Sequence, residues 1–302
     1  MSFSRKRERL TIILLIMIPI ASVAGWFLAR STIKGGETYE INIEGSSTVY
    51  KIIERSRITF NEYHPSIRVT VSGAGTGAGI ASLIDGQCDI AMASRPFKED
   101  EQINANGSLV DFAFAKDALA IIVHASANPI NITLDIARAI FNGTIDNWSH
   151  VTVSELGLTG DIQVVVRESG SGTRDAFNEL VMGDIKQLEP GSNYTSDALQ
   201  KSSNQLIKDA VAANSNYIGY LGLGYIDEEV KTLSIEGVTP SLESVKDGSY
   251  LIQRELYLIT LGEPEGLIRE FINWSFSPKG QDIVIETGFI NVAPTTDEIR
   301  YR

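Results

Sequence analysis

The stretch that decides the fold is VVVRESGSGTRDAF, residues 164–177. A run rich in β-branched residues begins at Ile162 and ends at Val166. It gives way to serine and glycine, and then to a mixed apolar and charged segment that reaches Val181. This order predicts a strand, a tight loop and the start of a helix.

The loop within this stretch has the composition of an anion-binding socket. Gly170 and Gly172 carry no Cβ atoms, so backbone N–H groups can turn inward, and Ser171 and Thr173 add hydroxyls beside the free amides of a helix start. Arg167 stands at the strand end, where a guanidinium can bind two oxygens of a tetrahedral oxyanion. A flexible Gly/Ser connection with a surface arginine is the alternative interpretation.

Two further stretches, residues 39–60 and 67–84, repeat this order. Each begins with an alternating strand, continues through a loop rich in glycine and hydroxyl residues, and ends in an apolar helix. Three such units can direct three helix N-termini at one ligand. The second loop has its glycines at 73, 75, 77 and 79, which does not match the G-x-G-x-x-G pattern of dinucleotide sites.

The N-terminus predicts export across a membrane. Residues 1–9 are rich in basic side chains, and residues 10–28 are almost wholly apolar. Residues 1–34 are therefore a signal peptide cleaved near Ala24 or a retained membrane anchor, and the sequence leaves both open. The single cysteine, Cys88, lies far from this segment, so a lipoprotein anchor and an internal disulfide are both excluded.

Charge and size restrict the partners of the exported part. The net charge of −12 argues against nucleic acid and anionic lipid surfaces as partners. The chain of 302 residues is long enough to form two lobes after the N-terminal segment. Six Asn-x-Ser/Thr sequons are expected in surface loops if the host glycosylates, although some arise by chance. They begin at Asn106, Asn131, Asn142, Asn147, Asn193 and Asn273.

Catalysis and metal binding are not predicted. A hydrolase that used Ser171 would need a nearby base, and the three histidines lie in no orienting pattern. The sequence around that serine also fails the G-x-S-x-G pattern. No second cysteine and no histidine pair stand at ligand spacing, so we expect no metal and no cofactor.

The remaining segments complete an alternating α/β pattern. A short buried strand before Ser94 and Arg95 brings both residues to a strand end, where ligands of open α/β sheets bind. Residues 112–123 predict a long strand that can cross between lobes, and residues 134–141 predict an amphipathic helix.

These motifs resemble, in order and spacing, the phosphate-binding proteins of phosphate ABC transporters. The resemblance covers residues 40–294, and its ordered matches make it more specific than one glycine loop. The matching segments are residues 45–49, 73–79, 89–95, 140–148, 167–173, 217–220, 254–257 and 276–281.

The resemblance implies an α/β, two-lobed periplasmic-binding-protein fold of type II, with two interlobe crossover strands and a ligand cleft between the lobes. Lobe one would comprise residues 38–116 plus 251–302, and lobe two residues 117–250. The second crossover would lie near residues 252–258.

The resemblance also implies the ligand contacts and the activity. Phosphate would be captured by an extracytoplasmic, monomeric binding protein that delivers it to the membrane subunits of an ABC transporter. Val49 and Gly172 would act through backbone N–H groups, and the other contacts through side chains. The contacts carried over by position are Thr48, Val49, Thr76, Ser94 and Arg95 from lobe one, and Arg167, Ser171, Gly172 and Thr173 from lobe two.

Two positions depart from the best-known members of that family. Where they have an aspartate that accepts the proton of hydrogen phosphate, this chain has Arg95, and a second acidic position is matched by Ser169. Glu168 and Asp175 are candidate acceptors, but we expect each to face solvent or to pair with an arginine. Sulfate, molybdate or another oxyanion therefore remains an alternative ligand, and phosphate sensing an alternative to transport.

Overall fold

The computed structural model describes residues 39–128, 131–151, 157–183, 194–294 and 296. The predicted signal peptide or anchor, residues 1–34, lies outside the described residues. The chain divides into two compact units, Met1–Tyr39 and Glu40–Arg302, and every described residue except Tyr39 belongs to the second. Among the described helices, none has the length and apolarity needed to span a membrane.

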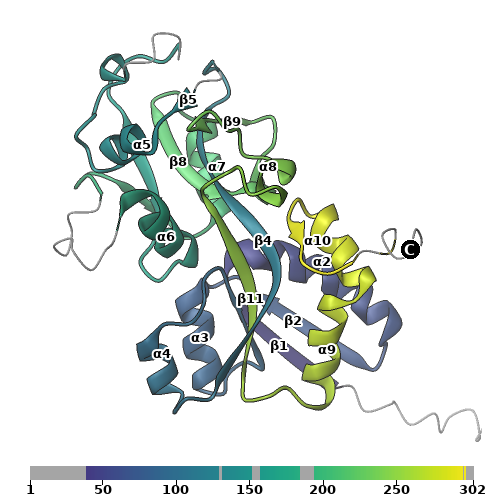
Figure 1. Ribbon diagram of the computed structural model, residues 1–302. Coiled ribbons are helices and arrows are strands. Elements are labelled where there is room, and N and C mark those ends of the chain that lie inside the picture. The colour runs from purple at the N-terminus through teal and green to yellow at the C-terminus, as the bar shows by residue number, and fades with distance from the viewer. Residues whose placement is uncertain (1–38, 129–130, 152–156, 184–193, 295, 297–302) are drawn as a thin grey trace, which may run out of the picture. The chain divides into compact units, whose positions relative to one another are not determined.

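The second unit is an α/β structure (Figure 1). Its strands are β1 Tyr39–Gly45, β2 Ile67–Ser72, β3 Ile90–Ala93, β4 Leu109–His124, β5 Asn131–Ile132, β6 Gln163–Arg167, β7 Leu199–Lys201, β8 Tyr217–Gly222, β9 Val230–Thr232, β10 Ser234–Ile235, β11 Gln253–Leu261 and β12 Ile290–Asn291. Its α-helices are α2 Ser47–Tyr63, α3 Thr76–Ile84, α4 Glu99–Asn104, α5 Leu134–Phe141, α6 Gly172–Phe177, α7 Asn204–Ala212, α8 Leu242–Lys246, α9 Gly266–Phe276 and α10 Pro278–Glu286. Short helical turns are η1 Trp148–His150, η2 Asn178–Met182 and η4 Leu223–Tyr225.

Two long strands connect two groups of elements. The strand order is β2-β1-β3-β11-β4-β8-β6-β7, with β9 and β12 also paired to β4. The first part of β4 pairs with β11, from Leu109 to Ala118, and its last part pairs with β8, from Leu119 to Val123. Figure 1 shows β4 and β11 running together from the group with β1, β2 and α2 to the group with β8, α5 and α6. We call the first group lobe one and the second lobe two.

Each lobe has its own hydrophobic core. In lobe one, Phe60 and Phe271 pack edge to face at 5.1 Å between ring centroids, in a cluster that joins α2, α9 and the strands. In lobe two, Phe177 stacks on Tyr220 at 3.9 Å, beside Phe141. The two clusters are separate, but the one in lobe two also takes in Ile252 and Ile290 from the C-terminal part of the chain, so some apolar packing crosses between the lobes.

The elements largely follow the sequence periodicity. The predicted helix 134–141 is α5, and the predicted strands 112–123 and 252–258 lie within β4 and β11, each slightly shifted or extended. Two loop expectations are wrong in their bounds. The expected glycine loop at 73–79 ends at Gly75, because α3 begins at Thr76. The loop after the first strand is also shorter than its composition indicates, because β1 continues through Glu44 and Gly45. These residues pair in parallel with Ala91 and Met92 of β3, and a Cβ atom at position 45 would lie 2.2 Å from the Met92 carbonyl oxygen.

Candidate functional site

The three predicted loops converge between the lobes, as their common pattern indicated. The backbone N–H of Gly75, in the second loop, donates at 2.7 Å to the carbonyl of Gly45, the last residue of β1 before the first loop. In the first turn of α3, which follows this loop, the N–H of Gly77 donates across the lobes to the carbonyl of Gly170 at 3.0 Å. Local caps fix the ends, since Ser46 and Ser171 accept from the first-turn amides of α2 and α6.

A buried group of polar side chains forms where these loops meet, and we call it the inner cluster. All of its members are buried, and three of them surround one hydroxyl. Its members are Thr48, Thr76, Ser94, Thr173, Asn204 and Arg254.

Thr48 Oγ1 is the centre of the inner cluster. It lies 3.1 Å from Thr173 Oγ1 across the lobes, and it accepts from Asn204 Nδ2 at 2.6 Å and from Arg254 Nη2 at 3.1 Å. Because two donors occupy its acceptor capacity, its own hydrogen is left for Thr173. The hydroxyl therefore joins both lobes and the crossover strand β11.

Arg254 is held by a carboxylate on the other crossover strand. Its Nε and Nη2 donate to Asp117 Oδ2 at 3.1 and 2.8 Å, and its Nη1 donates to the carbonyl of Gly172 at 3.2 Å. Asp117 also accepts from the N–H of Leu223 at 3.0 Å. Burial raises the pKa of Asp117 and lowers the pKa of Arg254, because each charge has lost its water.

The Arg167 guanidinium is buried beside the inner cluster. It is 1% exposed and donates from Nε and Nη2 to the two oxygens of Glu168, at 2.9 and 2.8 Å. Its Nη1 points to Thr173 Oγ1 at 3.4 Å. Of the two expectations for Glu168, the one in which it pairs with an arginine is therefore confirmed.

The strand end after β3 adds Ser94 to the inner cluster. Its backbone N–H donates to Thr76 Oγ1 at 3.2 Å, and its hydroxyl is in contact with the hydroxyl of Ser46. Gly172 approaches closely from lobe two, since a Cβ atom there would lie 2.4 Å from Thr76 Oγ1. Val49 and Ser171 are also buried at this point.

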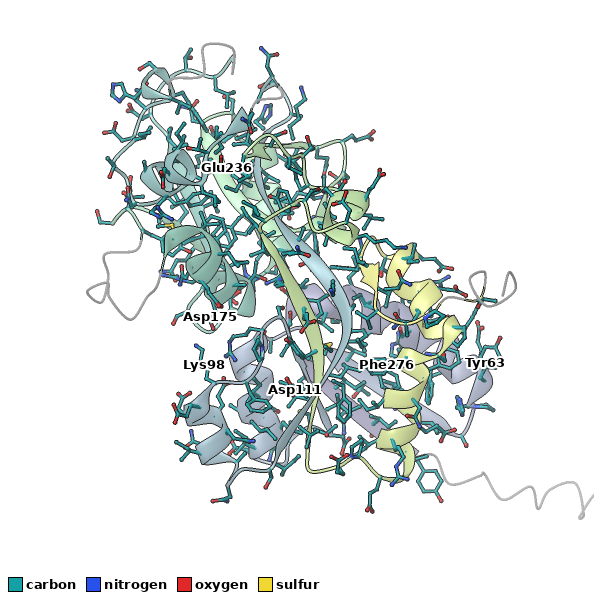
Figure 2. All side chains as sticks on the ribbon, viewed as in Figure 1. Tyr63, Lys98, Asp111, Asp175, Glu236 and Phe276 are labelled. Atoms are coloured by element: carbon teal, nitrogen blue, oxygen red, sulfur yellow. The ribbon has the colours of Figure 1, made fainter. Side chains whose placement is uncertain are left out.

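Arg95 has carboxylate partners at the edge of the site. It donates to both oxygens of Glu101 at 2.8 and 2.7 Å, and its Nε donates across the lobes to Asp175 at 2.7 Å. Lys98 Nζ also reaches Asp175 at 3.0 Å, and Figure 2 shows these two side chains facing each other at the edge of the molecule. We call Arg95, Lys98, Glu101 and Asp175 the outer bridge. Asp175 thus pairs with an arginine, as expected, and the role of Arg95 as a ligand contact stays a prediction.

Three residues of the site were not predicted from the sequence. Arg254 lies inside one of the matched motifs, but nothing local indicated that it faces the loops. Asp117 was visible beside Lys116 as a charge within a mostly apolar strand, which is a usable signal of a buried ion pair. Asn204 follows the Ser203 cap of α7, and its position gave no signal.

A groove of about 1170 Å³ opens beside the inner cluster, between α2 and α7. Its lining includes Ser47, Lys51, Lys208 and Tyr225, and none of the predicted ligand contacts. Two cross-lobe hydrogen bonds close one end, from Tyr225 to the Ser47 carbonyl and from Lys51 to the Gly224 carbonyl. Within the described part of the chain, no group of three or more metal-ligating side chains is found.

A protein-family model and several relatives match most of the chain. A model for the PBP superfamily domain matches residues 31–279. The phosphate-binding protein PstS of Bacillus subtilis is 31% identical over 259 residues, covering 85% of this chain and 81% of the relative. The Borreliella burgdorferi protein of the same name is 29% identical over 257 residues, covering 83% and 90%.

Solved structures that resemble this chain point to the same family as these relatives. A Clostridium perfringens chain crystallised with bound phosphate, and assigned as a phosphate ABC transporter substrate-binding protein, superposes with a TM-score of 0.76 at 30% identity. The match covers 84% of this chain and 99% of that one. An ABC-type phosphate transport receptor from Vibrio cholerae gives a TM-score of 0.67 at 31% identity, covering 83% and 99%.

Proposed function

The chain belongs to the PstS-type phosphate-binding proteins of phosphate ABC transporters, within the PBP superfamily, and we propose that it captures inorganic phosphate between its two lobes and delivers it to an ABC permease. Members of this family are two-lobed binding proteins and not enzymes. The protein is therefore an extracytoplasmic receptor.

The convergence of hydroxyls and guanidinia in a buried place between the lobes carries this proposal. Thr48 and Thr173 come from opposite lobes to within hydrogen-bond distance, and Arg167 and Arg254 lie beside them with little or no exposure. A phosphate bound there would exchange hydroxyl–hydroxyl contacts for charge-assisted bonds in a dry environment, where these bonds are strong.

The direct contacts that we propose are those expected from the resemblance. Side chains or backbone amides of both lobes would share the anion, so closure would complete a set of contacts that neither lobe offers alone. Such differential contacts stabilise the closed state, and the closed state would be recognised by the permease. The proposed contacts are Thr48, Val49, Thr76, Ser94, Arg95, Arg167, Ser171, Gly172 and Thr173.

Finer features of the proposal concern the rest of the chain. We place the lobe boundaries at residues 38–116 plus 251–302 for lobe one and 117–250 for lobe two. Residues 10–28 would tether the protein to the membrane unless cleavage occurs near Ala24. The receptor would act as a monomer, and the exposed sequons at Asn106, Asn131, Asn142 and Asn273 would be accessible to glycosylation.

Calorimetric titration of the full chain with phosphate, and then with sulfate, tests the proposal. Arg167→Ala should weaken phosphate binding at least a hundredfold, because two charge-assisted bonds at roughly 1.5–3 kcal/mol each would be lost. Arg68→Ala, at an exposed arginine of lobe one, is the control for net charge and should leave affinity unchanged.

Two results would contradict the proposal. Unchanged phosphate affinity in Arg167→Ala would remove the central assignment. A wild-type chain that binds sulfate and ignores phosphate would keep the anion site but overturn the substrate.

A further inference from the structure

One polar atom of the inner cluster has no hydrogen-bond partner among the described residues. Asn204 is fully buried, and its Nδ2 donates to Thr48 Oγ1 at 2.6 Å. Its Oδ1 is also buried, and among the described residues it accepts no hydrogen bond. Both atoms are bonded to the same carbon. The unpartnered oxygen therefore lies one amide width from the nitrogen that donates to the hydroxyl at the centre of the cluster.

A buried acceptor without a donor is unfavourable, and such atoms are rare in folded proteins. The donors nearby are already engaged, because Arg254 donates to Asp117, to Gly172 and to Thr48, and the Thr48 hydrogen is left for Thr173. An acceptor in this position therefore suits a ligand that brings its own O–H group.

The carboxylates at the site are not free to take that role. Glu168 is engaged by both nitrogens of Arg167, Asp175 by Arg95 and Lys98, and Asp117 by Arg254. Each is thus neutralised by a neighbouring cation among the described residues. An amide oxygen is the acceptor that remains.

We propose that Asn204 Oδ1 accepts a hydrogen bond from the hydroxyl of a protonated tetrahedral oxyanion and so selects hydrogen phosphate over sulfate. This inference rests on the proposed function. Sulfate carries no proton near neutral pH, so its oxygen would present a lone pair to the lone pairs of Oδ1. The amide itself does not titrate, and the selection therefore comes from the protonation state of the ligand alone.

Binding of phosphate, arsenate and sulfate to variants of the full chain tests this inference. Asn204→Ala should lower the ratio of phosphate to sulfate affinity by roughly tenfold or more, because one hydrogen bond specific to the protonated ligand is lost. Arsenate, which is protonated like phosphate, should lose affinity in parallel. Asn204→Asp keeps an acceptor of the same shape, so it should retain the preference for phosphate.

Ser203→Ala is the matched control, because it removes the cap of the same helix, where Ser203 Oγ accepts from the N–H of Leu206 at 3.1 Å. It should lower the melting temperature without changing the affinity ratio. If Asn204→Ala does not fold, Asn204→Asp decides the question.

The results that would contradict this inference can be distinguished from a failure of the proposed function. A wild-type chain that does not bind phosphate would remove both proposals. A wild-type chain that binds phosphate, with an unchanged affinity ratio in Asn204→Ala, would remove only this one. An Asn204→Asp variant that still binds phosphate but has lost the preference for phosphate over sulfate would also overturn it.

Discussion

The inner cluster and the outer bridge both join lobe one to lobe two, but in different surroundings. Thr48 and Asn204 are fully buried, and Thr48 meets Thr173 through neutral hydroxyls. In the outer bridge, the Lys98 side chain is 49% exposed and Asp175 is 21% exposed. The inner cluster is therefore dry, whereas the outer bridge reaches water through Lys98 and Asp175, although its Arg95 is buried.

This difference in solvent access separates recognition from closure. In a dry site each unpaired polar group costs free energy, so the inner cluster is sensitive to the identity of every atom. Ion pairs in contact with water contribute little, and salt screens them. We therefore expect the inner cluster to decide which anion binds. Arg95 is also a proposed ligand contact, but we expect the pairs of Asp175 with Arg95 and Lys98 to make only a small adjustment to the balance between open and closed forms.

The largest effect is expected from Arg254→Ala. This change leaves the fully buried carboxylate of Asp117 without its cation, and uncompensated buried charges of this kind cost about 3–5 kcal/mol. The free energy of unfolding, measured by urea titration monitored by tryptophan fluorescence, should fall by that amount.

The double variant Arg254→Met with Asp117→Asn is the control for this prediction. Because it removes both charges together, it should recover part of the lost stability. If Arg254→Ala unfolds at the wild-type urea concentration, the pair does not stabilise the crossover strands, and the distinction between dry and wet regions fails.

A smaller effect, confined to ligand binding, is expected from Gly172→Ala. The backbone at this position is compatible with alanine, but the new Cβ atom would lie 2.4 Å from Thr76 Oγ1 and 3.2 Å from Ser94 Cβ in the opposite lobe. The variant should fold normally yet fail to close fully. Small-angle scattering with saturating phosphate should show a larger radius of gyration than for the wild type.

Adding Thr76→Ala to Gly172→Ala separates closure from binding. Removal of the hydroxyl relieves the closest clash, so compaction on phosphate addition should return, although affinity stays reduced because one hydroxyl is gone. Full compaction in the single variant would show that the lobes need not approach as closely as the structure has them.

The smallest effect is expected from Asp175→Asn in the outer bridge. The change removes the pair with the half-exposed Lys98, which contributes about 0.2–1 kcal/mol, and the pair with Arg95, which is buried but keeps Glu101 as its carboxylate partner. Phosphate affinity in low salt should therefore fall several-fold at most, and titration in high salt should reduce the difference from the wild type.

Glu54→Gln is the matched control, because Glu54 pairs with Arg57 within one helix and does not cross between lobes. Its phosphate affinity should equal that of the wild type at every salt concentration. A hundredfold loss in Asp175→Asn would move the outer bridge into the recognition site and remove the distinction between the two regions.

Much of the local architecture was predictable from the sequence. Hydrophobic periodicity and capping residues predicted α5 at residues 134–141 and the central parts of strands β4 and β11. Hydroxyl and glycine residues at three strand ends indicated loops that bind an anion. These features depend on neighbours in the chain, which is why the pattern alone specifies them.

The partners of the polar side chains were decided by the tertiary structure. Arg254 reaches Thr48 from 206 positions away, and Asn204 reaches the same hydroxyl from 156 positions away. The first contact requires β11 to lie between β3 and β4, and the second requires the start of α7 to lie beside the start of α2. Hydrophobic periodicity cannot indicate contacts between residues so far apart in the chain. The sequence therefore determined where hydroxyl residues and turns occur, whereas the order of the strands in the sheet determined which charged and amide side chains surround them.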